Sequence, residues 1–301
     1  MAATPQPGLF ALGTSSQIYL ELDRTPRTTP GALVTAVAGL REPRTTMAGV
    51  NLVAGFRPEL WRMLRPKEHP AKLTGFERDL VGAGGYTMPA TQHDLVLWFA
   101  GPALDVVFDE ARSAVLAVSN VATVAEETVG WPYRRDRDLT GFIDGIENPT
   151  LVEAPGVATI PAGDPGAGGS VLLLQKWRHD AARWEALRPR EQERVIGRAK
   201  PDGTELDPKP PTSHVAKTDQ DVFGKIFRRN LPYGNVTDHG TMFVGFCREQ
   251  APLEKMLESM VGLLDGTRDA LTDHSQPRTG AYYFVPCVEA LADFAPRSVA
   301  E

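Results

Sequence analysis

The residues best suited to do chemistry lie in one short segment, Leu139–Pro149, with the sequence Leu-Thr-Gly-Phe-Ile-Asp-Gly-Ile-Glu-Asn-Pro. The segment fits neither helical nor strand periodicity. Gly141 and Gly145 flank Asp144, and because glycine has no side chain, the backbone can come close to a flat partner and aim the carboxylate at it. A carboxyl group placed in this way can accept and return a proton. An ordinary tight turn would have the same pattern, so residues further along the chain must distinguish the two interpretations.

Two later segments supply a histidine and an arginine that could act with this acid. His214 follows Asp144 by 70 residues, in Pro-Thr-Ser-His-Val, and Arg228-Arg-Asn-Leu-Pro-Tyr-Gly begins 14 residues after it. The six histidines and two cysteines form no His-x-x-x-His or Cys-x-x-Cys pair, so a structural zinc site is not indicated. The segment Gly-Phe-Ile-Asp-Gly-Ile-Glu-Asn-Pro and the order Asp, His, Arg-x-Asn resemble those of the dye-decolourising peroxidases, specifically the compact bacterial subgroup called B-type. The resemblance covers roughly the whole chain, from Gln17 to Pro286.

The resemblance implies a haem b cofactor with His214 as the protein ligand of its iron. A single axial histidine leaves the opposite position of the iron open, which is what peroxidase chemistry needs. An acidic group commonly holds the far ring nitrogen of a metal-bound histidine. Asp273, in Leu-Thr-Asp-His, is the candidate for that role.

The resemblance also implies which side chains act on the other face of the haem. Asp144 would move a proton between the two oxygens of hydrogen peroxide. Arg228 would stabilise the negative charge that develops as the O–O bond stretches, or contact a haem propionate, since its guanidinium stays charged. A solvated surface position is the alternative for this arginine. Asn230 would order water in the same pocket. Phe243 would restrict access to small molecules, unless it is an ordinary core residue.

The expected activity is that of a haem peroxidase, which reduces hydrogen peroxide through an oxo-ferryl intermediate and oxidises phenolic or dye-like donors by one-electron steps. The alternative is a protein that binds or delivers haem or its iron and has incidental peroxidase activity. A carrier does not need a paired acid and cation, so Asp144 and Arg228 argue against it. Compact members of the family form homo-oligomers, and some are encapsulated in protein nanocompartments, so we expect an oligomer and keep encapsulation as a further expectation.

The elements predicted to position these residues repeat in two halves. We expect strands over 16–22, 47–56, 93–99, 121–129, 170–177, 241–247 and 281–286, and helices over 31–40, 102–119, within 180–200 and over 251–264. The repetition predicts an α+β fold of duplicated ferredoxin-like modules, 1–150 ending in the Asp144 motif and 151–301 carrying the haem ligand. The resemblance implies that their antiparallel sheets form a barrel-like structure with the helices outside.

Composition limits the possible partners and location. Hydrophobic residues make up 42% of the 301 residues, enough for a sizeable core, and no apolar run approaches the roughly 20 residues of a membrane span. The net charge is −6 and the basic residues are scattered, so no nucleic-acid partner is expected. Cys247 and Cys287 lie in apolar segments and favour buried free thiols over a disulfide. The N-terminus has no secretion signal, and we expect a cytoplasmic protein.

Overall fold

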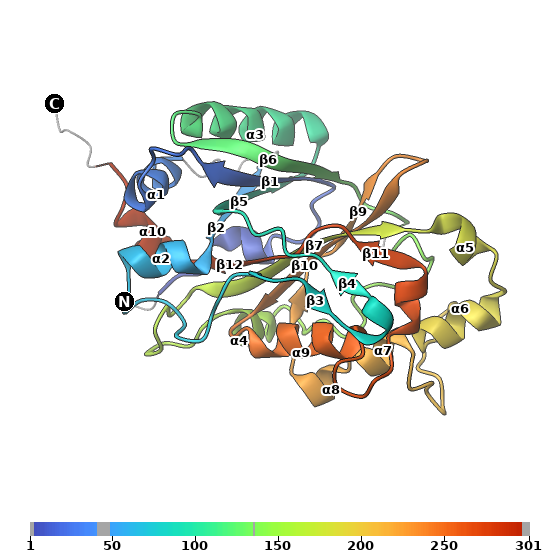
Figure 1. Ribbon diagram of the computed structural model, residues 1–301. Coiled ribbons are helices and arrows are strands. Elements are labelled where there is room, and N and C mark those ends of the chain that lie inside the picture. Colours follow the sequence, from blue (N-terminus) through green and yellow to red (C-terminus); the bar gives the residue numbers. More distant parts are fainter. Residues whose placement is uncertain (1–2, 41–48, 135, 297–301) are drawn as a thin grey trace.

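The computed structural model describes residues 3–40, 49–134 and 136–296. Its centre is a closed barrel of eight antiparallel strands, which follow one another around the ring in the order β7-β12-β2-β5-β1-β6-β9-β10, with β10 pairing again with β7 (Figure 1). These strands are β1 (Ser16–Arg24), β2 (Asn51–Phe56), β5 (Leu95–Gly101), β6 (Ala122–Gly130), β7 (Ser170–His179), β9 (Leu231–Gly234), β10 (His239–Cys247) and β12 (Ala281–Val285).

The two halves of the barrel have the same strand order. In chain order the first half contributes β1, β2, β5 and β6, and these lie in the sheet as β2-β5-β1-β6. The second half contributes β7, β9, β10 and β12, which lie as β9-β10-β7-β12. Each half therefore has the ferredoxin-like order of second, third, first and fourth strand. The fourth strand of each half pairs with the second strand of the other, through Gly130 and Tyr233 and through Phe284 and Phe56. The predicted fold class is confirmed, whereas the module boundary at residue 150 stays a prediction.

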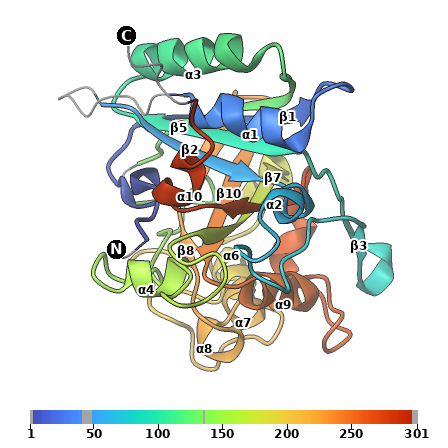
Figure 2. The same cartoon turned by 90° about the vertical axis from the view of Figure 1, so that its left-hand side faces the viewer.

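The helices lie outside the barrel. In Figures 1 and 2, α1 and α3 lie at one end of the view, and α7, α8 and α9 lie at the opposite end. The helices are α1 (Pro30–Ala38), α2 (Pro58–Leu64), α3 (Leu104–Val118), α4 (Ala154–Ala158), α5 (Ala181–Glu185), α6 (Pro189–Ile196), α7 (His214–Lys217), α8 (Gln220–Phe223), α9 (Ala251–Met260) and α10 (Val288–Ala292). Short elements complete the fold: strands β3 (Leu80–Val81), β4 (Thr87–Met88), β8 (Phe227–Arg228) and β11 (Ser275–Pro277), and 3₁₀ turns η1 (Pro7–Phe10), η2 (Ala83–Gly85) and η3 (Ala270–Asp273).

The predicted elements are present, with differences at their ends. The expected strand over 47–56 begins at Asn51, and its first two residues lie outside the described part of the chain. The helix expected over 251–264 ends at Met260. Gly262 has a φ of +78°, a left-handed conformation that commonly follows the end of a helix and that only glycine adopts without strain. The prediction was therefore about one turn too long.

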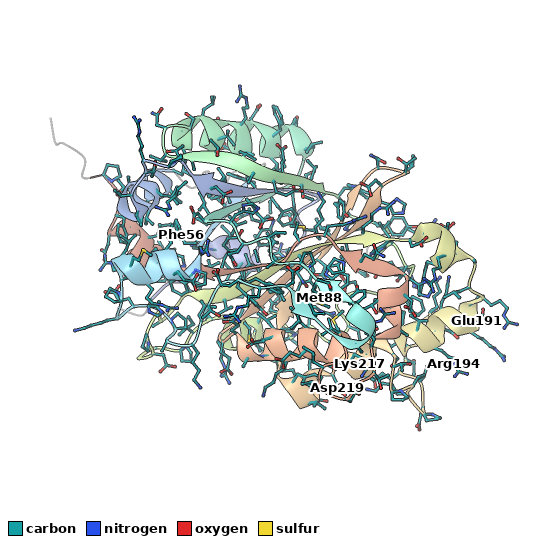
Figure 3. All side chains as sticks on the ribbon, in the orientation of Figure 1. Phe56, Met88, Glu191, Arg194, Lys217 and Asp219 are labelled. Carbon is teal, nitrogen blue, oxygen red and sulfur yellow. The ribbon has the colours of Figure 1, made fainter. Side chains whose placement is uncertain are left out.

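Alternation along the strands divides their side chains between two packed layers. On β7, Leu172 and Leu174 face the interior of the barrel, whereas Leu173 and Gln175 face outward towards the helices of the second half. On the other side of the molecule, Phe56 is fully buried and packs against Trp61 of α2, with ring centroids 5.4 Å apart. Figure 3 shows Phe56 within the fold, while Glu191 and Arg194 project from α6.

Two further sequence predictions can be compared with the structure. Cys247 and Cys287 are both buried and unpaired, which confirms the prediction of free thiols. Among the described residues, no helix combines the length and the apolar character needed to cross a membrane.

Candidate active site

A large cavity lies between the outer face of the second half of the barrel and the helices that cover it. Side chains of β7 and β10 form one wall, and residues of α7, α9 and the Asp144 segment form the others. Its empty space, including the part open to solvent, is about 1300 Å³. Apolar side chains such as Leu173, Val215 and Met260 make up much of the lining, with a few polar groups between them. This combination is typical of a site for a large, mainly apolar ligand.

The cavity brings together five of the six residues selected from the sequence. These are Asp144, His214, Arg228, Asn230 and Phe243. Asp273 does not line the cavity, and its side chain pairs with Arg268.

The Asp144 segment folds into a small hairpin whose backbone is tied down at several points. Arg137 and Ile143 form an isolated antiparallel bridge, and the N–H of Asp144 donates to the carbonyl oxygen of Asp136 at 2.7 Å. The guanidinium of Arg137 donates to the carbonyl oxygen of Gly141 at 2.7 Å. Gly141 and Gly145 have φ values of +83° and +78°, so both glycines are required by the turn itself. The turn and the functional interpretation of this motif are therefore compatible.

His214 begins α7, where the Ser213 side chain caps the helix. Its Nδ1 lies 2.7 Å from Oδ2 of Asp269, a fully buried carboxylate. Burial alone would lower the pKa of His214, but the charge and hydrogen bond of Asp269 outweigh it, and the pKa is raised. An Nδ1–H that donates to Asp269 leaves Nε2 without a proton, so that its lone pair could bind a metal ion.

The partner of His214 was predicted wrongly as Asp273. Asp269 precedes η3 and caps it, because its Oδ1 accepts from the N–H of Leu271 at 2.8 Å while Oδ2 faces His214. Asp273 ends η3, and its side chain is 44% exposed beside Arg268. One turn of 3₁₀ helix therefore separates an acid facing the cavity wall from an acid facing solvent.

Arg228 is fixed through its backbone. Its N–H donates to Oδ1 of Asn148 and its carbonyl oxygen accepts from Nδ2 of Asn148, both at 2.9 Å. The Nε of Arg228 is buried and has no hydrogen-bond partner among residues 3–40, 49–134 and 136–296. Nearby, Oδ1 of Asn230 accepts from the N–H of Val244 at 3.1 Å, which ties the next part of the segment to β10.

Phe243 lies over a glycine of its own strand. A Cβ added to Gly245 would lie 2.7 Å from the Phe243 ring, so this glycine lets the ring lie across the sheet surface. Phe243 is half-buried and lines the cavity between β10 and α9. Phe243 therefore lies beside the cavity, and its predicted role in restricting access stays a prediction.

Sequence reasoning missed several polar residues of the cavity. Asp138 lies six residues before Asp144, and burial, followed by the charge of Asp144, raises its pKa to about 6. Arg198 lines the cavity and forms ion pairs with Glu147 at 2.5 Å and with Glu205 at 2.8 Å. A second acid so close to the Asp144 motif was a visible signal for Asp138, whereas nothing in the local sequence distinguishes Arg198.

Trp184 separates the cavity from the surface. Its ring meets that of Phe142, a cavity residue, edge-on at 6.2 Å between centroids. Its indole N–H donates to the carbonyl oxygen of Thr140 at 3.1 Å. On its other side Trp184 lines two hollows that open on the surface, together with Tyr133. Trp184 therefore lies between these hollows and Phe142 of the cavity wall, and contacts both.

Comparison with known proteins shows the family of the chain. Residues 135–290 match the C-terminal part of the Dyp-type peroxidase family. A dye-decolorizing peroxidase of Mycolicibacterium paratuberculosis is 36% identical, over 97% of this chain and 86% of that protein. A dyp-type peroxidase protein of Shewanella oneidensis superposes with a TM-score of 0.89 at 29% identity, over 98% of this chain and 100% of that one.

Two further solved structures of dye-decolorizing peroxidases are similar to this chain. A variant of DypB from Rhodococcus jostii RHA1 in complex with heme gives a TM-score of 0.82 at 31% identity, over 97% of this chain and 97% of that one. The encapsulated DyP-type peroxidase of Mycobacterium smegmatis gives 0.84 at 34% identity, over 98% and 99%. With its residues 135–290 matching the family and a relative 36% identical over 97% of its length, this chain belongs to the dye-decolorizing peroxidase family.

Proposed function

We propose that this peroxidase binds haem b in the cavity, with Nε2 of His214 as the ligand of the iron. The observation that carries the proposal is the arrangement of His214, already paired with Asp269, in the same cavity as Asp144, Arg228 and Asn230. His214 comes from the helical side, and Arg228 comes from a strand that pairs with β10. A flat cofactor between them would have a ligand on one face and polar groups on the other.

The side chains of the cavity suit such a cofactor. Apolar residues from β7 and α9 match a porphyrin ring, and the fixed Nδ1 of His214 matches an axial ligand. The buried Nε of Arg228, which has no partner in the described part of the chain, is a donor available to an anionic group. When bound, haem would supply an iron–porphyrin centre that peroxide can oxidise by two electrons in total and that donors can reduce again in one-electron steps.

In this proposal, the protein contributes proton transfer and charge stabilisation. Asp144 takes the proton from one oxygen of hydrogen peroxide and returns it to the other, which leaves as water. Arg228 stabilises the negative charge on the departing oxygen. In the whole cycle one hydrogen peroxide and two phenolic donors give two waters and two phenoxyl radicals, so atoms and electrons balance.

The test is the rate at which one equivalent of peroxide changes the absorption of the ferric protein in a stopped-flow experiment. Arg228→Ala should slow this step by about 10² to 10³-fold, the usual cost of losing one such donor. Arg194→Ala is the matched control, because Arg194 is exposed on α6 (Figure 3). An unchanged rate in Arg228→Ala would contradict the role of this arginine. Haem loss to apomyoglobin faster than catalytic turnover would favour the haem-carrier function instead.

Donors too large for the cavity would be oxidised at the surface. We place this step at the hollows beside Trp184. The ring of Trp184 contacts Phe142, which in turn lines the cavity. A phenolic or dye-like donor bound there would give one electron through the indole and release its phenolic proton to solvent. The proposal therefore separates the site of peroxide cleavage from the site of donor oxidation.

We also propose that the protein is a cytoplasmic homo-oligomer that could be encapsulated, as the relative from M. smegmatis is. Leu104, Phe108 and Leu116 support an oligomer, because they are 51–57% exposed and follow one another along the outer face of α3. Light scattering tests this point, and a concentration-independent mass of 32.7 kDa would contradict it.

A further inference from the structure

We infer that Asn148 is a positioning residue that sets the place of the Arg228 guanidinium relative to Asp144. The inference rests on the proposed function, in which Arg228 faces bound peroxide. Asn148 itself is not among the residues that line the cavity, so it would act only through its contact with Arg228.

The first observation is the position of β8 at the edge of the sheet. In the sheet order, β8 follows β10 and ends the row, and Arg228 lies opposite Gly245 of β10. An edge strand leaves backbone groups without a neighbouring strand. The side-chain amide of Asn148 offers an acceptor and a donor side by side, and both meet the backbone of Arg228 at 2.9 Å. Asn148 thus takes the place of the missing strand at this single residue.

The second observation concerns the side chain of Arg228. Its Nε is buried without a partner, and no ion pair of Arg228 occurs among the described residues. Within the described part of the chain, no polar contact of the side chain therefore holds the guanidinium in place before a ligand binds. Its position follows from the backbone of Arg228 and from packing, and Asn148 holds both polar groups of that backbone.

The third observation is that Asn148 is rigidly connected to the acid. Its N–H donates to the carbonyl oxygen of Gly145 at 2.9 Å, which closes a turn directly after Asp144. Gly145 has a φ of +78° in this turn. The same short segment therefore carries the proposed proton-transferring carboxylate of Asp144 and the amide of Asn148 that hydrogen-bonds to the backbone of Arg228 in β8. In the sequence, Asn148 and Arg228 are 80 residues apart.

The experiment measures fluoride binding to the ferric haem-loaded protein by optical titration, which requires no turnover. Fluoride binds the open position of the iron and is stabilised by a charged donor nearby. A hydrogen bond to a charged group is worth about 1.5–3 kcal/mol, so Arg228→Ala should raise the fluoride Kd roughly 10- to 100-fold. Asn148→Ala should raise it roughly tenfold with unchanged haem content. Asn235→Ala is the control, because the side chain of this asparagine contacts its near neighbours Thr237 and Asp238 in an exposed turn.

The double variant separates positioning from general destabilisation. If Asn148 acts through Arg228, Asn148→Ala should not change the fluoride Kd further when Arg228 is already alanine. An equal effect in both backgrounds, or wild-type fluoride affinity in Asn148→Ala, would overturn the inference. If Arg228→Ala itself leaves fluoride binding unchanged, the proposed role of Arg228 fails instead.

A second readout does not depend on haem. In Asn148→Ala, amide hydrogen exchange of the segment 226–230 should be faster in the cofactor-free protein, since the Arg228 N–H loses its acceptor. If the alanine variant does not fold, Asn148→Asp keeps the shape and the acceptor but cannot donate to the carbonyl oxygen of Arg228. Exchange and fluoride affinity identical to wild type in Asn148→Asp would then overturn the requirement for the paired contact.

Discussion

Replacing Asp269 by asparagine is the sharpest test of how the protein holds His214, the proposed ligand of the iron. The carboxylate of Asp269 is fully buried, with Oδ2 at 2.7 Å from Nδ1 of His214 and Oδ1 at 2.8 Å from the N–H of Leu271. An asparagine has only one acceptor atom for these two donors. Its NH₂ group, which is a donor, must therefore face either the Nδ1–H of His214 or the N–H of Leu271, which are donors too. The other outcome is that His214 carries its proton on Nε2, where the proton would prevent binding to the iron.

The size of the effect follows from the lost contact. A hydrogen bond to a charged group contributes about 1.5–3 kcal/mol, and replacing a group that orients a metal ligand typically lowers metal affinity about 10- to 100-fold. We expect haem transfer from Asp269→Asn to apomyoglobin to be faster by about this factor. The negative charge also favours the ferric iron, so its loss should raise the ferric–ferrous potential, by about 60 mV for each tenfold difference in affinity between the two states.

Asp273→Asn is the matched control, since Asp273 pairs with Arg268 and does not line the cavity. Haem transfer and potential should be unchanged in this variant. Wild-type behaviour of Asp269→Asn, or a larger effect of Asp273→Asn, would refute the assignment of Asp269 as the partner of His214.

Three further variants test other parts of the structure. His214→Ala should lose most of its haem during purification, and full occupancy with an unchanged Soret band would contradict its role as the ligand. Trp184→Phe should lower turnover of bulky dyes several-fold while leaving the stopped-flow reaction with peroxide unchanged; equal loss of both would exclude a separate donor site. Burial raises the pKa of Glu21 to about 7, although a hydrogen bond from Tyr283 opposes this. Between its ordinary pKa of 4.5 and 7, the folded protein retains a proton that the unfolded chain releases, so stability falls as pH rises. Glu21→Gln should not show this loss, which is at most about 3 kcal/mol in the free energy of unfolding; parallel stability–pH curves would contradict it.

The local sequence determined the repeating elements and marked Asp144 as a candidate acid. Alternation and helical spacing are local patterns, so the strands at Ser16–Arg24 and Ser170–His179 and the helix at Leu104–Val118 could be predicted within a few residues. The glycines around Asp144 could be recognised as part of a tight turn, because a left-handed backbone conformation favours glycine at specific positions. Resemblance to a family supplied the order Asp144, His214 and Arg228, which local physics alone does not give.

Only the tertiary structure decided which groups meet. Asp269 and Asp273 are both aspartates a few residues apart, and the sequence does not distinguish them as partners of His214. The direction of one 3₁₀ turn determines which of them reaches His214. The contact between Asn148 and Arg228 joins residues 80 positions apart and exists because β8 has no strand beyond it. Such pairings depend on burial and on hydrogen bonds between distant segments. The contact of His214 with Asp269 forms within the second half and that of Asn148 with Arg228 between the two halves, and no local pattern encodes either.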